Sequence, residues 1–190
     1  MTVRMDPTKS QRTGHAGLAW HAPNLAGAET LALSSPDFEH EHAIATVHAA
    51  TRVGGENLSP ALTWSPVPAD TAQLLLVVED PDAPTPMPFV HCLALLDAST
   101  NSLAVGGLDV AGPAEGVRVL RSGIGSGYFG MAPPKSHGPH RYVFQLFALG
   151  TPLAERAHGA TLDSAKPRDV LTTTGHVLAR GRLDGFYGRN

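Results

Sequence analysis

Residues 73–92 read QLLLVVEDPDAPTPMPFVHC, and this stretch decides the fold. Its first part, residues 73–79, is apolar at nearly every position, which is typical of a strand covered on both faces and too short for a free-standing helix. Four prolines between positions 81 and 88 then hold the backbone as a stiff, extended loop. A second apolar run, residues 89–96, brings the chain back. We therefore predict two central strands joined by a rigid loop at one end of a sheet.

Other short segments, each bounded by Pro, Gly or Asn, also have the composition of strands. They are residues 30–35, 44–49, 61–64, 117–120, 141–149 and 178–188. Two short helices are predicted, one after Thr151-Pro152 and one across residues 166–174. So many buried strands favour a mainly β fold of two packed antiparallel sheets with one or two short helices.

The length of 190 residues suits one domain. Residues 1–28 are rich in Gly, Ala, His and Pro and show no periodicity, so we predict a weakly ordered N-terminal arm there. Residues 29–190 are predicted to form the folded domain.

Composition argues against several classes of function. The net charge is −3 and no run of Lys or Arg is present, so nucleic acid is not expected as a partner. Cys92 is the only cysteine, which excludes an intrachain disulfide and a thiolate metal cluster. No apolar run approaches the ~20 residues of a membrane span, and residues 1–17 do not have the pattern of a secretory signal. We therefore expect a cytoplasmic protein without a membrane span.

The proline-rich loop carries the first candidate site. It holds Asp80 and Asp82 at the end of the sheet, and the next strand brings His91 back towards the same end. Two carboxylates and an imidazole can therefore meet there. The alternative is that both aspartates only cap turns, as Asp before Pro often does. Strand alternation would turn Cys92 to the face opposite His91, as a buried and unreactive thiol.

Residues 132–142 read APPKSHGPHRY and form a second stiff loop that leads into a central strand. Alternation along that strand places His140 and Tyr142 on one face and Arg141 on the other. An arginine on so apolar a strand needs a carboxylate partner, and Asp82 is the nearest candidate by topology. We predict that this pair is structural.

The two segments resemble the phosphatidylethanolamine-binding protein family, which includes the Raf kinase inhibitor proteins. The motif DPDAP (80–84) followed by His91, and the motif GPHRYVFQLFAL (138–149), carry the resemblance. It extends from LALSSPDF through ENLSPALTW to the final GHVLARGRLDGFYGR, or roughly residues 30–189. The resemblance implies two antiparallel sheets with a small anion-binding pocket built from these loops.

The resemblance also implies the residues of that pocket. Its lining would be Asp80, His91, His140, Tyr142 and the backbone N–H of Ala132. Its structural support would come from Asp82, Arg141, Pro133 and Pro134. The chain departs from the family pattern at Cys92, Leu96 and Met131, where the family usually carries tryptophan, asparagine and proline. The chain ends after its last strand, so it is similar to the bacterial subgroup that lacks a C-terminal helix, and this subgroup suggests a homodimer.

These features predict a binding module and not a conventional enzyme. The expected ligand is a small anion, such as a phosphate or a phospholipid headgroup, which a protein partner could also present. Neither a cofactor nor a metal is expected. The alternative is a metal-assisted hydrolase that uses Asp80, Asp82, His91 and His140 as ligands, since Asp and His side chains at one cleft suit zinc or manganese.

Overall fold

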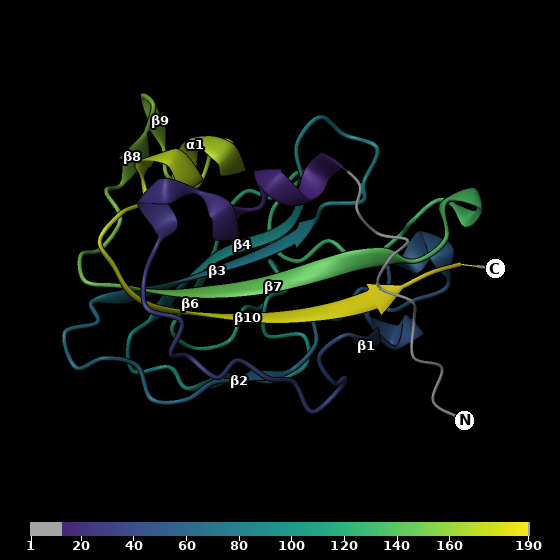
Figure 1. Cartoon of the computed structure of the whole chain (residues 1–190), viewed down its shortest axis with the longest axis horizontal. Coiled ribbons are helices and arrows are strands. Elements are labelled where there is room, and N and C mark those ends of the chain that lie inside the picture. The colour runs from purple at the N-terminus through teal and green to yellow at the C-terminus, as the bar shows by residue number, and fades with distance from the viewer. Residues whose placement is uncertain (1–12, 190) are drawn as a thin grey trace.

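The structure is a computed structural model that describes residues 13–189 (Figure 1). Its strands are β1 (His42–Ala43), β2 (Leu62–Thr63), β3 (Gln73–Asp80), β4 (Phe89–Asp97), β5 (Ser102–Leu103), β6 (Val117–Val119), β7 (His140–Leu149), β8 (Arg156–Ala157), β9 (Ala160–Thr161) and β10 (Val177–Tyr187). The helices in this part of the chain are α1 (Pro167–Thr173) and the 3-10 helices η2 (Thr13–Gly17), η3 (Ala19–His21), η4 (Pro23–Leu25), η5 (Thr46–His48), η6 (Thr51–Val53) and η7 (Lys135–His137).

A central sheet organises the molecule, with the strand order β1-β10-β7-β3-β4-β6 over the described residues. The short β1 pairs in parallel with β10, and the other neighbours are antiparallel. Two small sheets, β2-β5 and β8-β9, lie outside it. The predicted mainly β fold is confirmed. The second layer is smaller than expected, because it consists of the β2-β5 pair and the loops around it.

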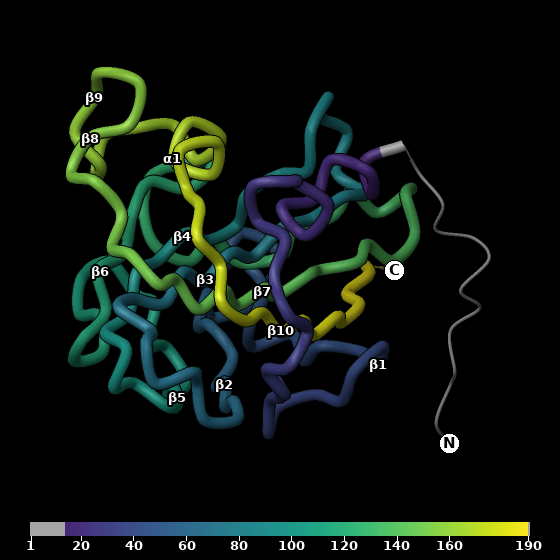
Figure 2. Tube along the Cα trace, turned by 60° about the vertical axis from the view of Figure 1, so that its left-hand side comes forward, coloured from purple at the N-terminus to yellow at the C-terminus, as the bar shows by residue number. Residues whose placement is uncertain are grey.

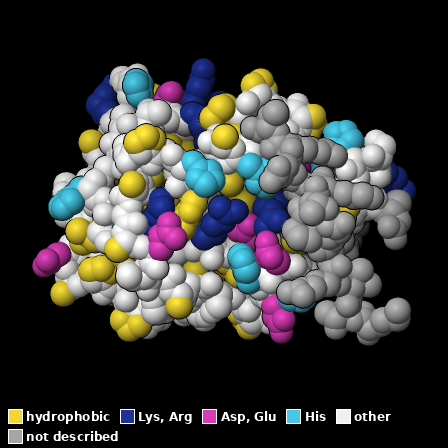
Figure 3. All heavy atoms as spheres, viewed as in Figure 1, with side chains coloured by type: hydrophobic (Ala, Val, Ile, Leu, Met, Phe, Trp, Pro, Cys, Tyr) yellow, Lys and Arg dark blue, Asp and Glu magenta, His cyan; other side chains and the backbone are white. Residues whose placement is uncertain are grey.

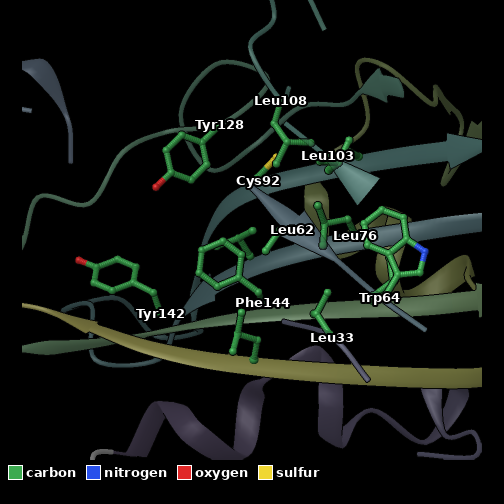
Figure 4. Close-up of a cluster of buried hydrophobic side chains, with 14 of the residues drawn as sticks. Leu33, Leu62, Trp64, Leu76, Cys92, Leu103, Leu108, Tyr128, Tyr142 and Phe144 are labelled. Carbon is green, nitrogen blue, oxygen red and sulfur yellow. The ribbon is translucent and has the colours of Figure 1, made fainter. Parts of the chain in front are cut away.

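Both faces of the central sheet are covered, which explains the unbroken apolar runs of β3, β4 and β7. The β2-β5 sheet and its loops lie on one side, and α1 and the helices η2 to η4 lie on the other (Figure 2). Leu62, Trp64 and Leu103 from the first side pack against Leu76 and Phe144 of the sheet (Figure 4). A strand buried on both faces cannot alternate between apolar and polar residues.

The N-terminal segment 13–28 is packed against the sheet, and the prediction of a weakly ordered arm is wrong for this part. Residues 1–12 of the predicted arm lie outside the described residues. The backbone N–H of Ala19 donates to Glu79 Oε2 at 2.8 Å, and that of Trp20 donates to Gln145 Oε1 at 2.6 Å. Glu79 is fully buried, and Arg168 Nη2 of α1 lies 2.6 Å from its other oxygen. Polar side chains on the sheet therefore hold in place a segment whose sequence has no hydrophobic periodicity.

Some predicted elements differ from the observed ones. Residues 30–35 contribute only a bridge from Ser34 to Thr63, and residues 46–48 form η5 in place of a strand. There the backbone N–H groups of His48 and Ala49 donate to the carbonyls three residues earlier, those of Ala45 and Thr46, so the chain turns and does not pair as a strand. The helix predicted after Thr151-Pro152 is replaced by the β8-β9 hairpin, whose turn holds residues 158 and 159 at positive φ. The second predicted helix is observed as α1.

Candidate functional site

Asp80 and His140 meet at one end of the central sheet. Asp80 is the last residue of β3 and His140 is the first of β7, and both side chains are buried. His140 Nδ1 donates to Asp80 Oδ2 at 2.7 Å. The other oxygen of Asp80 accepts the backbone N–H of Asp82 at 2.8 Å, inside the proline-rich loop. This loop therefore holds the carboxylate in position, and the carboxylate orients the imidazole of His140.

A β-bulge brings His91 to the same place. Val78 pairs with Cys92 whereas Glu79 pairs with Val90, so His91 is the extra residue on β4. A bulge redirects one side chain without ending the strand. His91 Nδ1 donates to the carbonyl of Phe129 at 2.6 Å, and its Nε2 lies 4.0 Å from Asp80 Oδ2. Burial lowers the pKa of His91 from its usual value, although the nearby Asp80 carboxylate opposes this shift.

The same bulge overturns the prediction for Cys92, which does not point to the face opposite His91. Cys92 packs in the core cluster that also contains Tyr142, and the ring of His91 meets the ring of Tyr142 edge-on at 5.1 Å. The thiol is fully buried, and burial raises its pKa to about 12. Cys92 is therefore a protonated core residue at neutral pH.

Two polar side-chain atoms of the predicted ligand-binding residues are buried without a hydrogen-bond partner among the described residues. They are Nε2 of His140 and the hydroxyl of Tyr142. Burial, and then the negative charge of Asp80, raise the pKa of Tyr142 far above its usual value, so the phenol keeps its proton. Because buried polar groups are nearly always paired, these two atoms are candidates for ligand contacts.

Both atoms belong to side chains that line a cavity of about 120 Å³, which we call the sheet-end pocket. Its lining consists of Arg52, Asp80, Ala83, Pro84, Phe89, His91, Ile124, Phe129, Ala132, Pro133, Pro134, His140 and Tyr142. The five residues predicted as ligand contacts thus lie around one cavity. Sequence reasoning missed Arg52, whose guanidinium lies 5.7 Å from the ring centre of Phe129. No motif points to Arg52, because it lies on η6, which is distant from both loops in the sequence.

Arg141 lies on the opposite face of β7, as predicted, but its predicted side-chain pair with Asp82 is wrong. The guanidinium of Arg141 binds Asp184 Oδ2 at 2.6 Å and Glu41 Oε1 at 3.1 Å. Asp82 instead accepts the backbone N–H of Arg141 at 2.8 Å. Asp184 is on β10, two residues before the cross-strand neighbour of Arg141, so the shared sheet face decides the pairing.

Asp82 joins the pocket to the N-terminal segment. His15 Nε2 lies 3.6 Å from Asp82 Oδ1. Burial alone would raise the pKa of Asp82, but contacts with His15 and with the N–H of Arg141 outweigh it and lower the pKa. Asp82 is therefore an ionised residue that supports the proline-rich loop. Among residues 13–189, no group of three or more His, Cys, Asp or Glu side chains is arranged to hold a metal ion.

Comparisons with known proteins agree with this architecture. The family model described as phosphatidylethanolamine-binding protein matches residues 34–188. The fungal phomoidride biosynthesis cluster protein B is 34% identical over 166 residues, which cover 83% of this chain and 78% of that protein. A relative from Mycobacterium tuberculosis, which is named as the lipoprotein LppC, is 35% identical over 158 residues. The match covers 83% of this chain and 74% of the relative.

A solved structure shows the same fold. The crystal structure of Escherichia coli YbcL, described as a member of the mammalian PEBP family, superposes with a TM-score of 0.73 at 28% identity. The match covers 84% of this chain and 99% of YbcL. None of the helices in the described residues is long and apolar enough to span a bilayer. With the family model matched over most of its length, the chain belongs to the phosphatidylethanolamine-binding protein family.

Proposed function

We propose that the sheet-end pocket binds a small phosphate-bearing anion and that the protein is a binding module. The observation that carries this proposal is the pair of buried atoms without partners, His140 Nε2 and the Tyr142 hydroxyl, in the lining of one cavity. An anion supplies the acceptors that these atoms lack. The backbone N–H of Ala132 is the further donor that we propose, and Arg52 adds positive charge at the pocket.

The hydrogen bonds around the pocket indicate that anion binding takes up protons. The Nδ1 atoms of His140 and His91 donate to Asp80 and to the Phe129 carbonyl. In a neutral imidazole the other nitrogen is then an acceptor, so Nε2 donates to an anion only when the ring is protonated. The charge of Asp80 is partly balanced by His140 and by the N–H of Asp82. A bound anion would therefore lie near a carboxylate whose charge is already partly compensated.

Calorimetric titration with sulfate tests this proposal, because sulfate keeps its charge throughout the histidine range. Affinity should rise between about pH 8 and about pH 6, by up to roughly tenfold per pH unit for each proton taken up. His140→Gln and His91→Gln should each reduce this slope, and His158→Gln, an exposed residue in the β8-β9 turn, is the matched control. A flat pH profile, or native slopes in both pocket variants, would contradict the proposal.

The ligand itself is proposed as either a free phosphate ester or a phospholipid headgroup. Calorimetry with phosphoethanolamine and co-sedimentation with phosphatidylethanolamine vesicles separate these two sources. Binding of the free ester without binding of vesicles would assign the pocket to soluble ligands. A regulatory role through a protein partner, a homodimeric state and a cytoplasmic location are further parts of the proposal. Pull-down, analytical ultracentrifugation and cell fractionation test them in turn.

The alternative of a metal-assisted hydrolase is not favoured. Of its four expected ligands, Asp80 already binds His140, and Asp82 is turned towards the backbone of Arg141. A metal would have to displace both contacts. Stoichiometric zinc or manganese in the purified protein, lost in His91→Ala, would support the hydrolase instead.

A further inference from the structure

A second cavity, of about 620 Å³, lies on the other side of the central sheet from the Tyr142 side chain. We call it the arginine cavity. Its lining consists of His15, Trp20, Glu29, Leu31, His40, Glu41, Arg141, Arg180, Gly181, Arg182 and Asp184. Figure 3 shows basic, acidic and histidine side chains gathered on this face, over β10. Of this set, only Arg141 belongs to the two motifs that form the pocket loops, and none lines the sheet-end pocket.

Three guanidinium groups share this cavity because of the sheet register. Arg180 and Arg182 are two residues apart on β10, so they project from the same face of the sheet. Arg141 of β7 is the direct neighbour of Phe186 and projects from that face too. The Arg180 side chain is 12% exposed and that of Arg141 is 9% exposed. The Arg182 side chain is 23% exposed. Strand pairing therefore concentrates positive charge on one face of the sheet, where two of the three guanidinium groups are largely shielded from water.

Two of these guanidinium groups, those of Arg180 and Arg141, also have contacts that do not involve acidic residues. Arg180 Nη1 donates to the carbonyl of Trp20 at 2.7 Å, and the guanidinium lies 4.0 Å above the Trp20 ring. Arg141 lies 4.5 Å above the ring of Phe186. The Nε atoms of Arg180 and Arg141 are buried and have no hydrogen-bond partner among the described residues. The site is thus preorganised and has donors left over, which favours binding of a ligand with several acceptors.

The acidic partners of the three arginines differ in how deeply they are buried. Asp184 is buried, and it binds both Arg141, at 2.6 Å, and Arg182, at 2.7 Å. The other two carboxylates come from the side chains of Glu29 and Glu41, which are 61% and 50% exposed. Exposed carboxylates of this kind contribute little to stability, and a competing carboxylate can displace them at small cost. Only one of the three arginines' charges is therefore balanced by a buried carboxylate.

We propose that the arginine cavity binds a small molecule that carries two or more carboxylate groups. One carboxylate would take the place of Glu29 against Arg180, and a second would bind Arg182, the same-face neighbour of Arg180 on β10. Arg141, which shares Asp184 with Arg182, would contribute further positive charge. The two glutamates already show that carboxylates can reach these guanidinium forks. Same-face residues two apart on a strand are separated by about 7 Å. This spacing suits a short aliphatic di- or tricarboxylate.

Titration of the full chain with citrate and with succinate, by calorimetry near neutral pH, tests the proposal. We expect saturable binding of one ligand per chain. Arg182→Gln and Arg180→Gln should each weaken citrate binding by at least about tenfold, through loss of a charge-assisted hydrogen bond. Arg118→Gln is the matched control. Arg118 also binds two carboxylates, those of Glu155 and Asp163, but it does not line the cavity.

The glutamates give a readout that a purely structural ion-pair network would not. Glu29→Gln and Glu41→Gln remove the competing carboxylates, so each should raise citrate affinity by about two- to fivefold. His140→Gln should leave citrate binding unchanged, which separates this site from the sheet-end pocket. Retained sulfate binding and melting temperature will show that Arg182→Gln is folded; Asp184 keeps Arg141 as a partner in that variant.

Three results would each overturn the proposal. The first is the absence of saturable citrate binding up to about 10 mM. The second is native citrate affinity in both arginine variants. The third is unchanged or weaker binding after removal of the glutamates. A failure of this kind would leave the proposed anion pocket untouched, because sulfate binding there depends on His140 and His91.

Discussion

Replacing Tyr142 with phenylalanine should weaken anion binding and, at the same time, leave the unliganded protein at least as stable as before. The Tyr142 hydroxyl is buried and makes no hydrogen bond to the described residues, so folding removes it from water without compensation. Such a group costs about 1–3 kcal/mol. Tyr142→Phe removes that cost while keeping the ring, which packs on His91. The free energy of unfolding should therefore stay the same or rise by up to that amount.

The effect on binding has the opposite sign. A hydrogen bond to a charged group contributes about 1.5–3 kcal/mol. At about 1.4 kcal/mol for each tenfold change, the loss corresponds to sulfate affinity that is about 10- to 150-fold weaker. Because burial keeps the Tyr142 phenol protonated, this loss should be the same across the histidine range of pH. It can thus be distinguished from the pH-dependent part that we assign to the imidazoles.

Tyr128→Phe is the matched control for stability. Tyr128 belongs to the same core cluster, and burial raises its pKa as well, but its hydroxyl donates to the carbonyl of His48 at 2.9 Å. Its loss should destabilise the fold by about 1 kcal/mol. Urea denaturation gives the free energies of unfolding, and calorimetry near pH 6 gives the sulfate affinities. If Tyr142→Phe destabilises the protein as much as Tyr128→Phe, or binds sulfate with native affinity, our assignment of Tyr142 as a ligand donor is refuted.

Three further predictions concern stability. Glu79→Gln should lower the free energy of unfolding, measured by urea denaturation, by about 2–4 kcal/mol, because two buried hydrogen bonds lose a charged acceptor. It should also speed hydrogen exchange at the N–H of Ala19. Exchange protection at the native level would show that this contact does not anchor the N-terminal segment. Arg141→Ala should cost about 3 kcal/mol because it breaks a buried ion pair, and a loss below about 1 kcal/mol would mean that the pair behaves as an exposed one. The lowered pKa of His91 means that the unfolded chain binds a proton more readily than the folded one, so the free energy of unfolding should fall as pH drops below about 6.5. His91→Gln should reduce this pH dependence, and bound sulfate should oppose it. Equal pH dependence in the native protein and the variant would contradict this assignment.

The amino-acid sequence was sufficient to identify the central strands and the pocket loops. The apolar runs at 73–79, 89–96 and 141–149 correspond to β3, β4 and β7, because strands buried on both faces need apolar residues throughout. The prolines of the two loops also restrict the backbone locally, wherever the loops lie. Local signals of this kind depend on a few neighbouring residues, so they can be interpreted without knowledge of the rest of the chain.

The tertiary structure alone decided where strand alternation is interrupted and which partner each side chain finds. The bulge at His91 depends on how β4 pairs with β3, so alternation within one strand gave the wrong face for Cys92. Arg141 binds Asp184 in place of Asp82, since residues 43 positions apart become neighbours only when β7 and β10 pair. The packing of the N-terminal segment has the same cause, because Glu79 and Gln145 lie side by side only in the folded sheet. Contacts between segments distant in sequence leave no periodic pattern, and for this reason the arginine cavity could be found only in three dimensions.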